Sequence, residues 1–248
     1  MDYIKDIDKV YVIHCVENEK RLNNINFQKT KNKWLNNKLE IWWTCYHPYS
    51  DIMANAMILS GKSRYISNKN ELNLVREFYT IIKTSYYKGY NNICIFEDDF
   101  SLINEEYFNQ FMINIPNDFD IIQLSYLLVE KNIHNINYLL SNNILWIEKN
   151  NGGWSNNGII LSRNGMKYFI DFIDNEFVAA DIPMHESKNK DMYYGRINQS
   201  RNLNHYISSI PLVFVDGYDS TVQNNTKDEI YKLYREQLNK DLYNIYQN

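Results

Sequence analysis

Short apolar runs alternate along the chain with segments of helical periodicity. The runs are rich in β-branched and aromatic residues and break off sharply into polar residues, as buried parallel strands do. The strands predicted in this way are residues 10–13, 39–44, 92–96, 119–124, 144–147, 159–161 and 211–215. The predicted helices are a crossover segment around Phe27, Trp34 and Leu35, residues 71–88, residues 105–113, a segment that carries Met166, Phe169, Ile170 and Ile173, and about 226–246. This alternation predicts an α/β fold with a mostly parallel sheet flanked by helices.

Capping residues sharpen the predicted ends of the helices. Asn70 is placed to cap the helix over 71–88, Gly89 suits its C′ position, and Ser162 can cap the helix that follows it. A capping-box pattern precedes the amphipathic closing helix at about 226–246, for which packing against the sheet and a role at a partner or membrane surface are both open. The polar, poorly periodic stretch 180–206 is interpreted as a long loop. Neither a repeat nor a linker interrupts the chain, so we expect one domain over 1–248.

Three consecutive acids, Glu97, Asp98 and Asp99, follow one of the apolar runs directly. Ligands bind at the carboxyl ends of the strands in such sheets, and adjacent carboxylates repel one another unless a cation neutralises them. Mg²⁺ and Mn²⁺ prefer oxygen ligands and bridge carboxylates to phosphates. Glu97 and Asp99 would share a side if the strand continued, whereas Asp98 and Asp99 would act together if the chain turned. The alternative interpretation is a solvated acidic loop that caps a following helix.

Composition narrows the class of protein. The 248 residues carry a net charge of −4 with 23% charged and 44% hydrophobic residues, without a basic block, which disfavours general nucleic-acid binding. No apolar stretch is long enough to span a membrane and no signal-peptide pattern begins the chain, so we expect a cytoplasmic protein. Cys15, Cys45 and Cys94 are interpreted as reduced core residues. The phosphate-binding and dinucleotide glycine motifs are missing, so a diphosphate would need a metal at the acids.

Taken in order, several blocks of the chain resemble glycosyltransferase family 25, whose lipopolysaccharide-biosynthesis and procollagen galactosyltransferase members have the GT-A fold. The resembling blocks are 10–13 followed by Arg21, 71–87, 95–99, 119–124, 158–165, Ala180-Asp181 and 219–222. One departure from the family pattern is Arg76-Glu77, which stands where the family has Ser-His. The resemblance implies a Rossmann-like nucleotide-diphospho-sugar transferase, with a UDP-sugar as the expected donor and Mn²⁺ or Mg²⁺ as the cofactor.

The resemblance also implies roles for individual residues. Asp99 with Glu97 or Asp98 would hold the metal on the donor diphosphate, and His14, Glu17, Arg21 and Asp98 would line the nucleotide site. Asp181 would deprotonate the acceptor hydroxyl in an inverting reaction. The alternatives are a solvated helix residue for Arg21 and a helix N-cap for Asp181. Further candidates for metal, base or stacking contacts are His185, Glu186, Asp216, Asp219, Trp154 and Tyr218.

The acceptor is open at this stage and includes a glycan, a lipid-linked glycan, a protein and a modified base. Two rival functions are also open. A metal-dependent nucleotidyltransferase or phosphohydrolase would place acids at the same strand end but would act on the phosphate ester itself. A non-catalytic carbohydrate-binding module on the same fold would show no metal-dependent binding of a donor.

Overall fold

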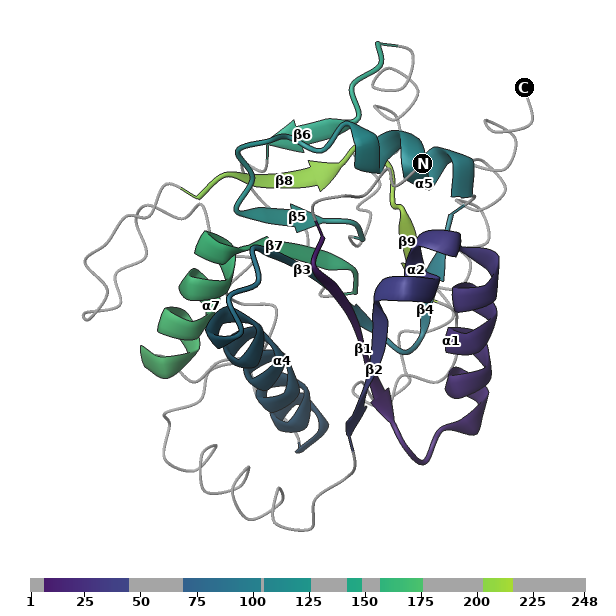
Figure 1. Cartoon of the computed structure of the whole chain (residues 1–248), viewed down its shortest axis with the longest axis vertical. Helices are drawn as coiled ribbons and strands as arrows, with labels where there is room; N and C mark the ends of the chain where they lie inside the picture. Colours follow the sequence, from purple (N-terminus) through teal and green to yellow (C-terminus); the bar gives the residue numbers. More distant parts are fainter. Residues whose placement is uncertain are drawn as a thin grey trace, which may run out of the picture. The chain divides into compact units, whose positions relative to one another are not determined.

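A seven-stranded sheet flanked by helices forms the centre of the computed structural model, which describes residues 7–44, 69–103, 105–125, 142–148, 157–175 and 203–215. The strands of this sheet are β1 (Lys9–Cys15), β2 (Leu39–Thr44), β3 (Asn92–Glu97), β5 (Ile121–Gln123), β6 (Trp146–Glu148), β7 (Ile159–Ser162) and β8 (His205–Ser208). The described helices are α1 (Glu19–Lys31), α2 (Lys33–Lys38), α4 (Lys69–Tyr87), α5 (Glu105–Ile113) and α7 (Arg163–Asn175). The α/β fold predicted from the sequence is therefore confirmed (Figure 1).

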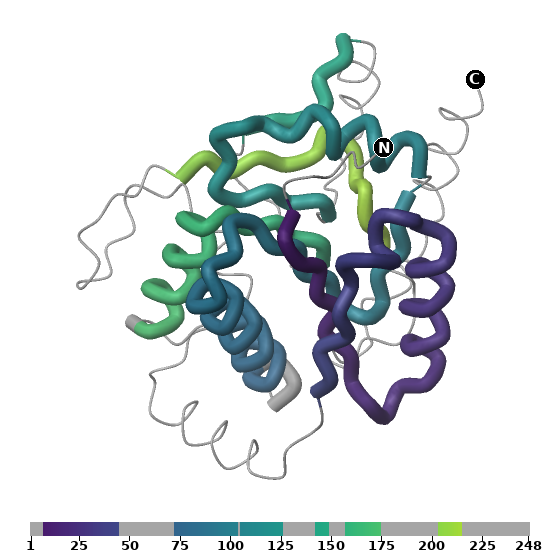
Figure 2. Tube along the Cα trace, viewed as in Figure 1, coloured from purple at the N-terminus to yellow at the C-terminus, as the bar shows by residue number. Residues whose placement is uncertain are grey.

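The strand order is β2-β1-β3-β7-β5-β8-β6. β1 pairs in parallel with β2 and β3, and β5 pairs in parallel with β8, whereas β7 runs antiparallel to both β3 and β5, and β6 runs antiparallel to β8. β1, β2, β3, β5 and β8 consequently point one way, and the sheet is mixed but mostly parallel. A second, two-stranded antiparallel sheet joins β4 (Phe100–Leu102) to β9 (Val213–Val215), two segments far apart in sequence that Figure 2 traces side by side.

Each face of the main sheet is covered by its own set of helices. Tyr11, Ile13, Ile93 and Ile95 belong to one core cluster together with the apolar sides of α4 and α7, which pack against each other. Alternate residues of a strand point to opposite faces, so Val12, Cys94 and Phe96 face the other way. There Phe96 contacts Trp34 of α2 and stacks on Phe100 of β4. Because both faces are buried at the centre of the sheet, β1, β3 and β7 are mostly apolar runs, whereas the edge strands β2 and β6 are only partly buried.

Several predicted boundaries are confirmed and others are wrong. The end of α4 matches the expectation, because Gly89 has φ +82° and the amides of Gly89 and Tyr90 bond the carbonyls of Tyr86 and Ser85, as in a Schellman cap. Asn70, however, does not cap α4, since the helix already includes Lys69. The predicted loop 180–206 overlaps strand β8, which begins at His205.

The C-terminal part of the chain lies outside the described residues. The chain divides into two compact units, Met1–Val215 and Asp216–Asn248, and the predicted helix at about 226–246 falls in the second. The single domain over 1–248 stays a prediction. Among the described helices, none is both long and apolar enough to cross a membrane.

Gly165 allows the start of α7 to approach β5 closely. A Cβ atom at Gly165 would lie 2.1 Å from the carbonyl oxygen of Asp120. We expect Gly165→Ala to lower the free energy of unfolding by about 3 kcal/mol, measured by urea denaturation, because the backbone atoms it meets cannot move aside cheaply. Gly89→Ala is the matched control, since nothing lies within 4 Å of its Cβ position. It should cost only roughly 1 kcal/mol, from its positive φ; equal losses in the two variants would contradict the packing argument.

Candidate active site

The carboxyl ends of β1, β2 and β3 lie side by side because the three strands are parallel neighbours. Ile13 pairs with Glu97 and Cys15 with Thr44 in the register of the sheet. After Glu97 the chain turns through Asp98 and Asp99 directly into β4. The interpretation as a loop that caps a following helix is therefore wrong, since the next element is a strand.

A buried ion pair joins α1 to this turn. Arg21 Nη1 lies 2.5 Å from Asp98 Oδ1, and Arg21 Nη2 lies 3.6 Å from Asp99 Oδ2. Arg21 is 7% exposed and Asp98 only 4%, so the alternative interpretation of Arg21 as a solvated helix residue is wrong. Asn18 caps α1 by accepting the Arg21 amide, which fixes the helix turn that carries the guanidinium.

The second oxygen of Asp98 is also occupied. His14 Nδ1 lies 2.9 Å from Asp98 Oδ2, and the Cys15 amide donates to the same oxygen at 3.3 Å. A carboxylate that faces Arg21 accepts hydrogen bonds, so the Nδ1 nitrogen of His14 is the donor in this contact. The imidazole is fully buried, and its Nε2 has no hydrogen-bond partner among the described residues. The centroids of the His14 and Trp43 rings lie 5.2 Å apart in an edge-on arrangement.

Asn157 connects the other two acids, and the sequence did not single it out. Its side-chain nitrogen donates to Asp99 Oδ1 at 2.8 Å, and its side-chain oxygen accepts the Glu97 amide at 3.2 Å. Asn157 is 2% exposed and precedes Gly158, whose φ is +83°. A Cβ atom on Gly158 would lie 2.8 Å from Val213. In the sequence, the glycine- and asparagine-rich loop before β7 was the signal that could have pointed to Asn157. Its partner Glu97 is 60 residues away along the chain, so no local spacing connects the two.

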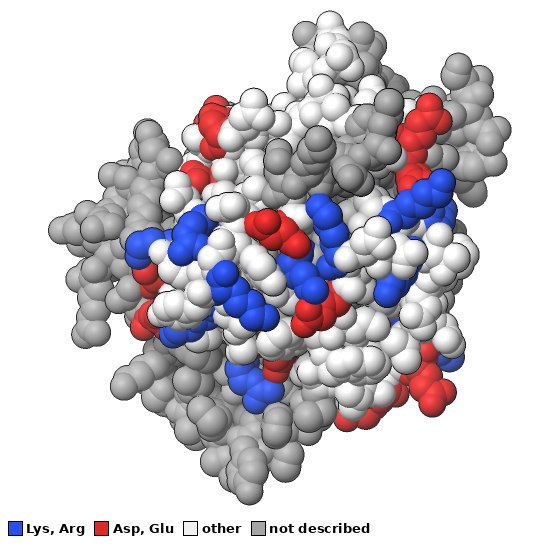
Figure 3. Space-filling model, viewed as in Figure 1, with Lys and Arg blue, Asp and Glu red and all other residues white. Residues whose placement is uncertain are grey.

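Charge at the site is dominated by the carboxylates around Arg21. Burial lowers the pKa of Arg21, but the negative charges of Asp98, Asp99 and Glu97 and the hydrogen bond to Asp98 outweigh burial and raise that pKa above its usual value. Away from this buried cluster, Lys and Arg are interspersed with Asp and Glu over the described part of the face in Figure 3.

Cys15 and Glu17 form a further contact at the end of β1. The Cys15 thiol donates to Glu17 Oε2 at 2.6 Å, and Cys15 is only half-buried. The prediction of a core residue therefore holds for Cys94, which is fully buried, but is wrong for Cys15; Cys45 lies outside the described residues. Burial and then the Glu17 carboxylate raise the pKa of the Cys15 thiol to about 11.

The donor set for a cation consists of hard oxygen ligands. Asp98 is held by Arg21 and His14, and Asp99 accepts from Asn157 and lies near Arg21. Glu97 and Asp99 are the two carboxylates that the sequence predicts as cation ligands. The described residues contain no group of three or more His, Cys, Asp or Glu side chains that could hold a metal. Mg²⁺ is held in many enzymes by only one or two carboxylates together with substrate phosphates, so two oxygen donors fit that ion.

Of the residues predicted from the sequence, His14, Arg21, Glu97, Asp98 and Asp99 come together at this edge, with Glu17 beside them. The remaining candidates lie outside the described residues: Trp154, Asp181, His185, Glu186, Asp216, Tyr218 and Asp219. Their roles stay predictions.

Comparisons with known proteins add little to this geometry. No family model matches the chain, and no curated protein matches it, so the resemblance to glycosyltransferase family 25 is not confirmed. Among solved structures, the chain is similar to mouse xyloside xylosyltransferase 1 in its apo form, with a TM-score of 0.31 and 9% identity. That alignment covers 66% of this chain and 71% of the mouse chain. At this TM-score the likeness does not establish a shared fold.

Asp98→Asn should destabilise the fold by about 3 kcal/mol, because it removes the nearer of the two carboxylates that pair with the buried Arg21 guanidinium. The free energy of unfolding from urea titration measures the loss. Asp171→Asn is the control, since Asp171 pairs with Lys167 at the surface of α7 and such pairs contribute roughly 0.5 kcal/mol. A loss in Asp98→Asn as small as in the control would show that the ion pair does not hold α1 to the turn.

The Cys15 thiol should resist iodoacetamide at pH 8, because a pKa of about 11 leaves only about one thiol in a thousand ionised. Its alkylation rate should rise steeply only as the pH approaches the raised pKa, and peptide mass spectrometry separates it from the other cysteines. Glu17→Gln should speed alkylation several-fold without restoring the rate of an exposed thiol, because burial, the larger cause, remains. Rapid alkylation of the folded wild type at pH 8 would contradict the assigned pKa.

Proposed function

We propose that this chain is a glycosyltransferase that moves a sugar from a nucleotide-diphospho-sugar to an acceptor hydroxyl. The observation that carries the proposal is the cluster of Arg21, His14 and three acids at the carboxyl ends of parallel strands. This edge is where α/β sheets bind their ligands, and no glycine-rich phosphate loop is present in the sequence to hold a diphosphate by other means. A UDP-sugar is the proposed donor.

The proposed roles follow from the partners of each carboxylate and from the resemblance described above. Asp98 acts as a positioning residue that holds Arg21 and His14. Glu97 and Asp99 would hold Mg²⁺ or Mn²⁺ on the donor diphosphate, with Asn157 orienting Asp99. The metal would stabilise the negative charge that develops on the nucleotide diphosphate as it leaves.

The rest of the reaction needs a base for the acceptor hydroxyl. Asp181 is proposed for this role in an inverting reaction, on the strength of its position in the sequence blocks. The proposed acceptor classes are a glycan, a lipid-linked glycan, a protein and a modified base, each of which presents a hydroxyl to the same donor.

Asp99→Asn should reduce release of nucleotide diphosphate from the preferred sugar nucleotide by at least about 100-fold, because the charge that holds the cation is lost. The assay screens UDP-sugars first and then other nucleotide sugars, with Mn²⁺ or Mg²⁺, and follows nucleotide diphosphate by coupled absorbance. The same donor should raise the melting temperature of the wild type only when metal is present.

Asp171→Asn, a substitution on the far element α7, should leave turnover unchanged and serves as the control. Hydrolysis of simple phosphate esters with no turnover of any sugar nucleotide would replace the proposal with the phosphohydrolase alternative. Binding of sugars without turnover and without a metal requirement would favour the carbohydrate-binding alternative.

A further inference from the structure

Glu77 is a buried carboxylate on α4, whose other buried residues are mostly apolar. It is 7% exposed, among core neighbours such as Val75, Phe78 and Ile81. Its carboxylate accepts from Trp42 Nε1 at 2.7 Å and lies 3.4 Å from Thr44 Oγ1. Both partners belong to the last residues of β2, so Glu77 reaches from the helix to the strand end that borders the candidate active site.

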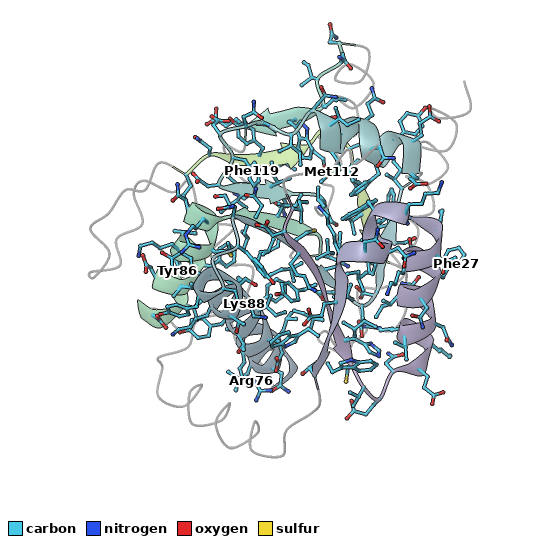
Figure 4. All side chains as sticks on the ribbon, in the orientation of Figure 1. Phe27, Arg76, Tyr86, Lys88, Met112 and Phe119 are labelled. Carbon is cyan, nitrogen blue, oxygen red and sulfur yellow. The ribbon has the colours of Figure 1, made fainter. Side chains whose placement is uncertain are left out.

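Arg76 neutralises this carboxylate. Its Nε and Nη2 lie 3.1 Å and 2.6 Å from Glu77 Oε1, although consecutive helix residues do not normally face each other. The side chain of Arg76 is 45% exposed and comes from the amino-terminal half of α4, where Figure 4 labels it. An apolar residue would fill the same place without the cost of burying a charge, so the packing of α4 alone does not account for Glu77.

The consequence of these contacts lies on the opposite face of the sheet. Glu77 holds Trp42 on the α4 side, where its ring meets Tyr11 edge-on. The next residue, Trp43, therefore points to the side of His14, and as a residue it is 53% exposed beside the buried charge cluster. Thr44 extends the pairing between β2 and the end of β1, because its carbonyl accepts the Val16 amide at 3.0 Å.

We propose that Glu77 is a positioning residue that fixes the end of β2 and so presents Trp43 to the substrate. The proposal rests on the proposed function for its kinetic consequences, because Trp43 is taken to contact the sugar nucleotide. Glu77 itself is buried and touches no substrate. Its effect is transmitted through Trp42 and Thr44 to the exposed side chain of Trp43.

Hydrogen exchange tests the positioning without any substrate. Glu77→Ala should speed exchange of amides in residues 13–16 and 41–44 by roughly tenfold or more, while amides of β5 and β8 keep their protection. Glu77→Gln, which keeps an oxygen acceptor for Trp42, should restore most of the protection. Unchanged exchange at the end of β2, or an equal increase across the whole sheet, would overturn the proposal.

A double-mutant cycle tests the route through Trp43. Once wild-type turnover of a sugar nucleotide is measured, Glu77→Ala should raise its KM about tenfold with kcat changed less than twofold, and Trp43→Ala should raise KM similarly. In the Trp43→Ala background, Glu77→Ala should have little further effect on KM. Additive effects would overturn the proposal. If the wild type turns over no sugar nucleotide, the proposed function fails, and the exchange experiment still decides whether Glu77 positions β2.

Discussion

The buried pair of Arg21 and Asp98 is the interaction on which the candidate site depends. It crosses from α1 to the turn after β3, and each charge is nearly inaccessible to water. A buried charge is tolerated only when it is paired and its remaining hydrogen-bonding capacity is satisfied. His14 and the Cys15 amide complete that requirement on the second oxygen of Asp98. The end of β1, the start of α1 and the β3–β4 turn are thereby held as one unit.

Around this unit, close approaches of the backbone determine the positions of neighbouring side chains. Gly158 lets the start of β7 pack against Val213, Leu124 and Phe96, which brings Asn157 between Glu97 and Asp99. The antiparallel direction of β7 matters here, because it places the amino end of that strand beside the carboxyl end of β3. A purely parallel sheet would have put the opposite end of β7 at the site, and Asn157 would have been absent from it.

Local patterns predicted most of the strands and helices, because the period of apolar residues reports directly on burial. They also predicted that the acids lie at the carboxyl end of a strand, whereas the place of His14 and Arg21 beside them came from the resemblance to glycosyltransferase family 25. The direction of a strand was harder to predict, because the sequence of a short apolar run such as 159–161 suits a parallel and an antiparallel strand equally well. β4 and β8 were missed because they are short and owe their pairing to distant partners. Asn157 and Glu77 were missed for the same reason, since each depends on tertiary contacts rather than on any local spacing.

The pairing of Arg21 also bears on why a cation belongs to the proposed reaction. Burial lowers the pKa of Arg21, but the nearby carboxylates of Asp98, Asp99 and Glu97 outweigh burial and raise it, so one positive charge faces three carboxylates. A bound nucleotide diphosphate would add further negative charge to the same edge, and Coulomb repulsion is strong where water is excluded. Arg21 is already committed to Asp98 and cannot compensate that addition by itself. In the proposed reaction, a divalent ion held by Asp99 and Glu97 would supply the compensating positive charge without breaking the ion pair that holds the site together.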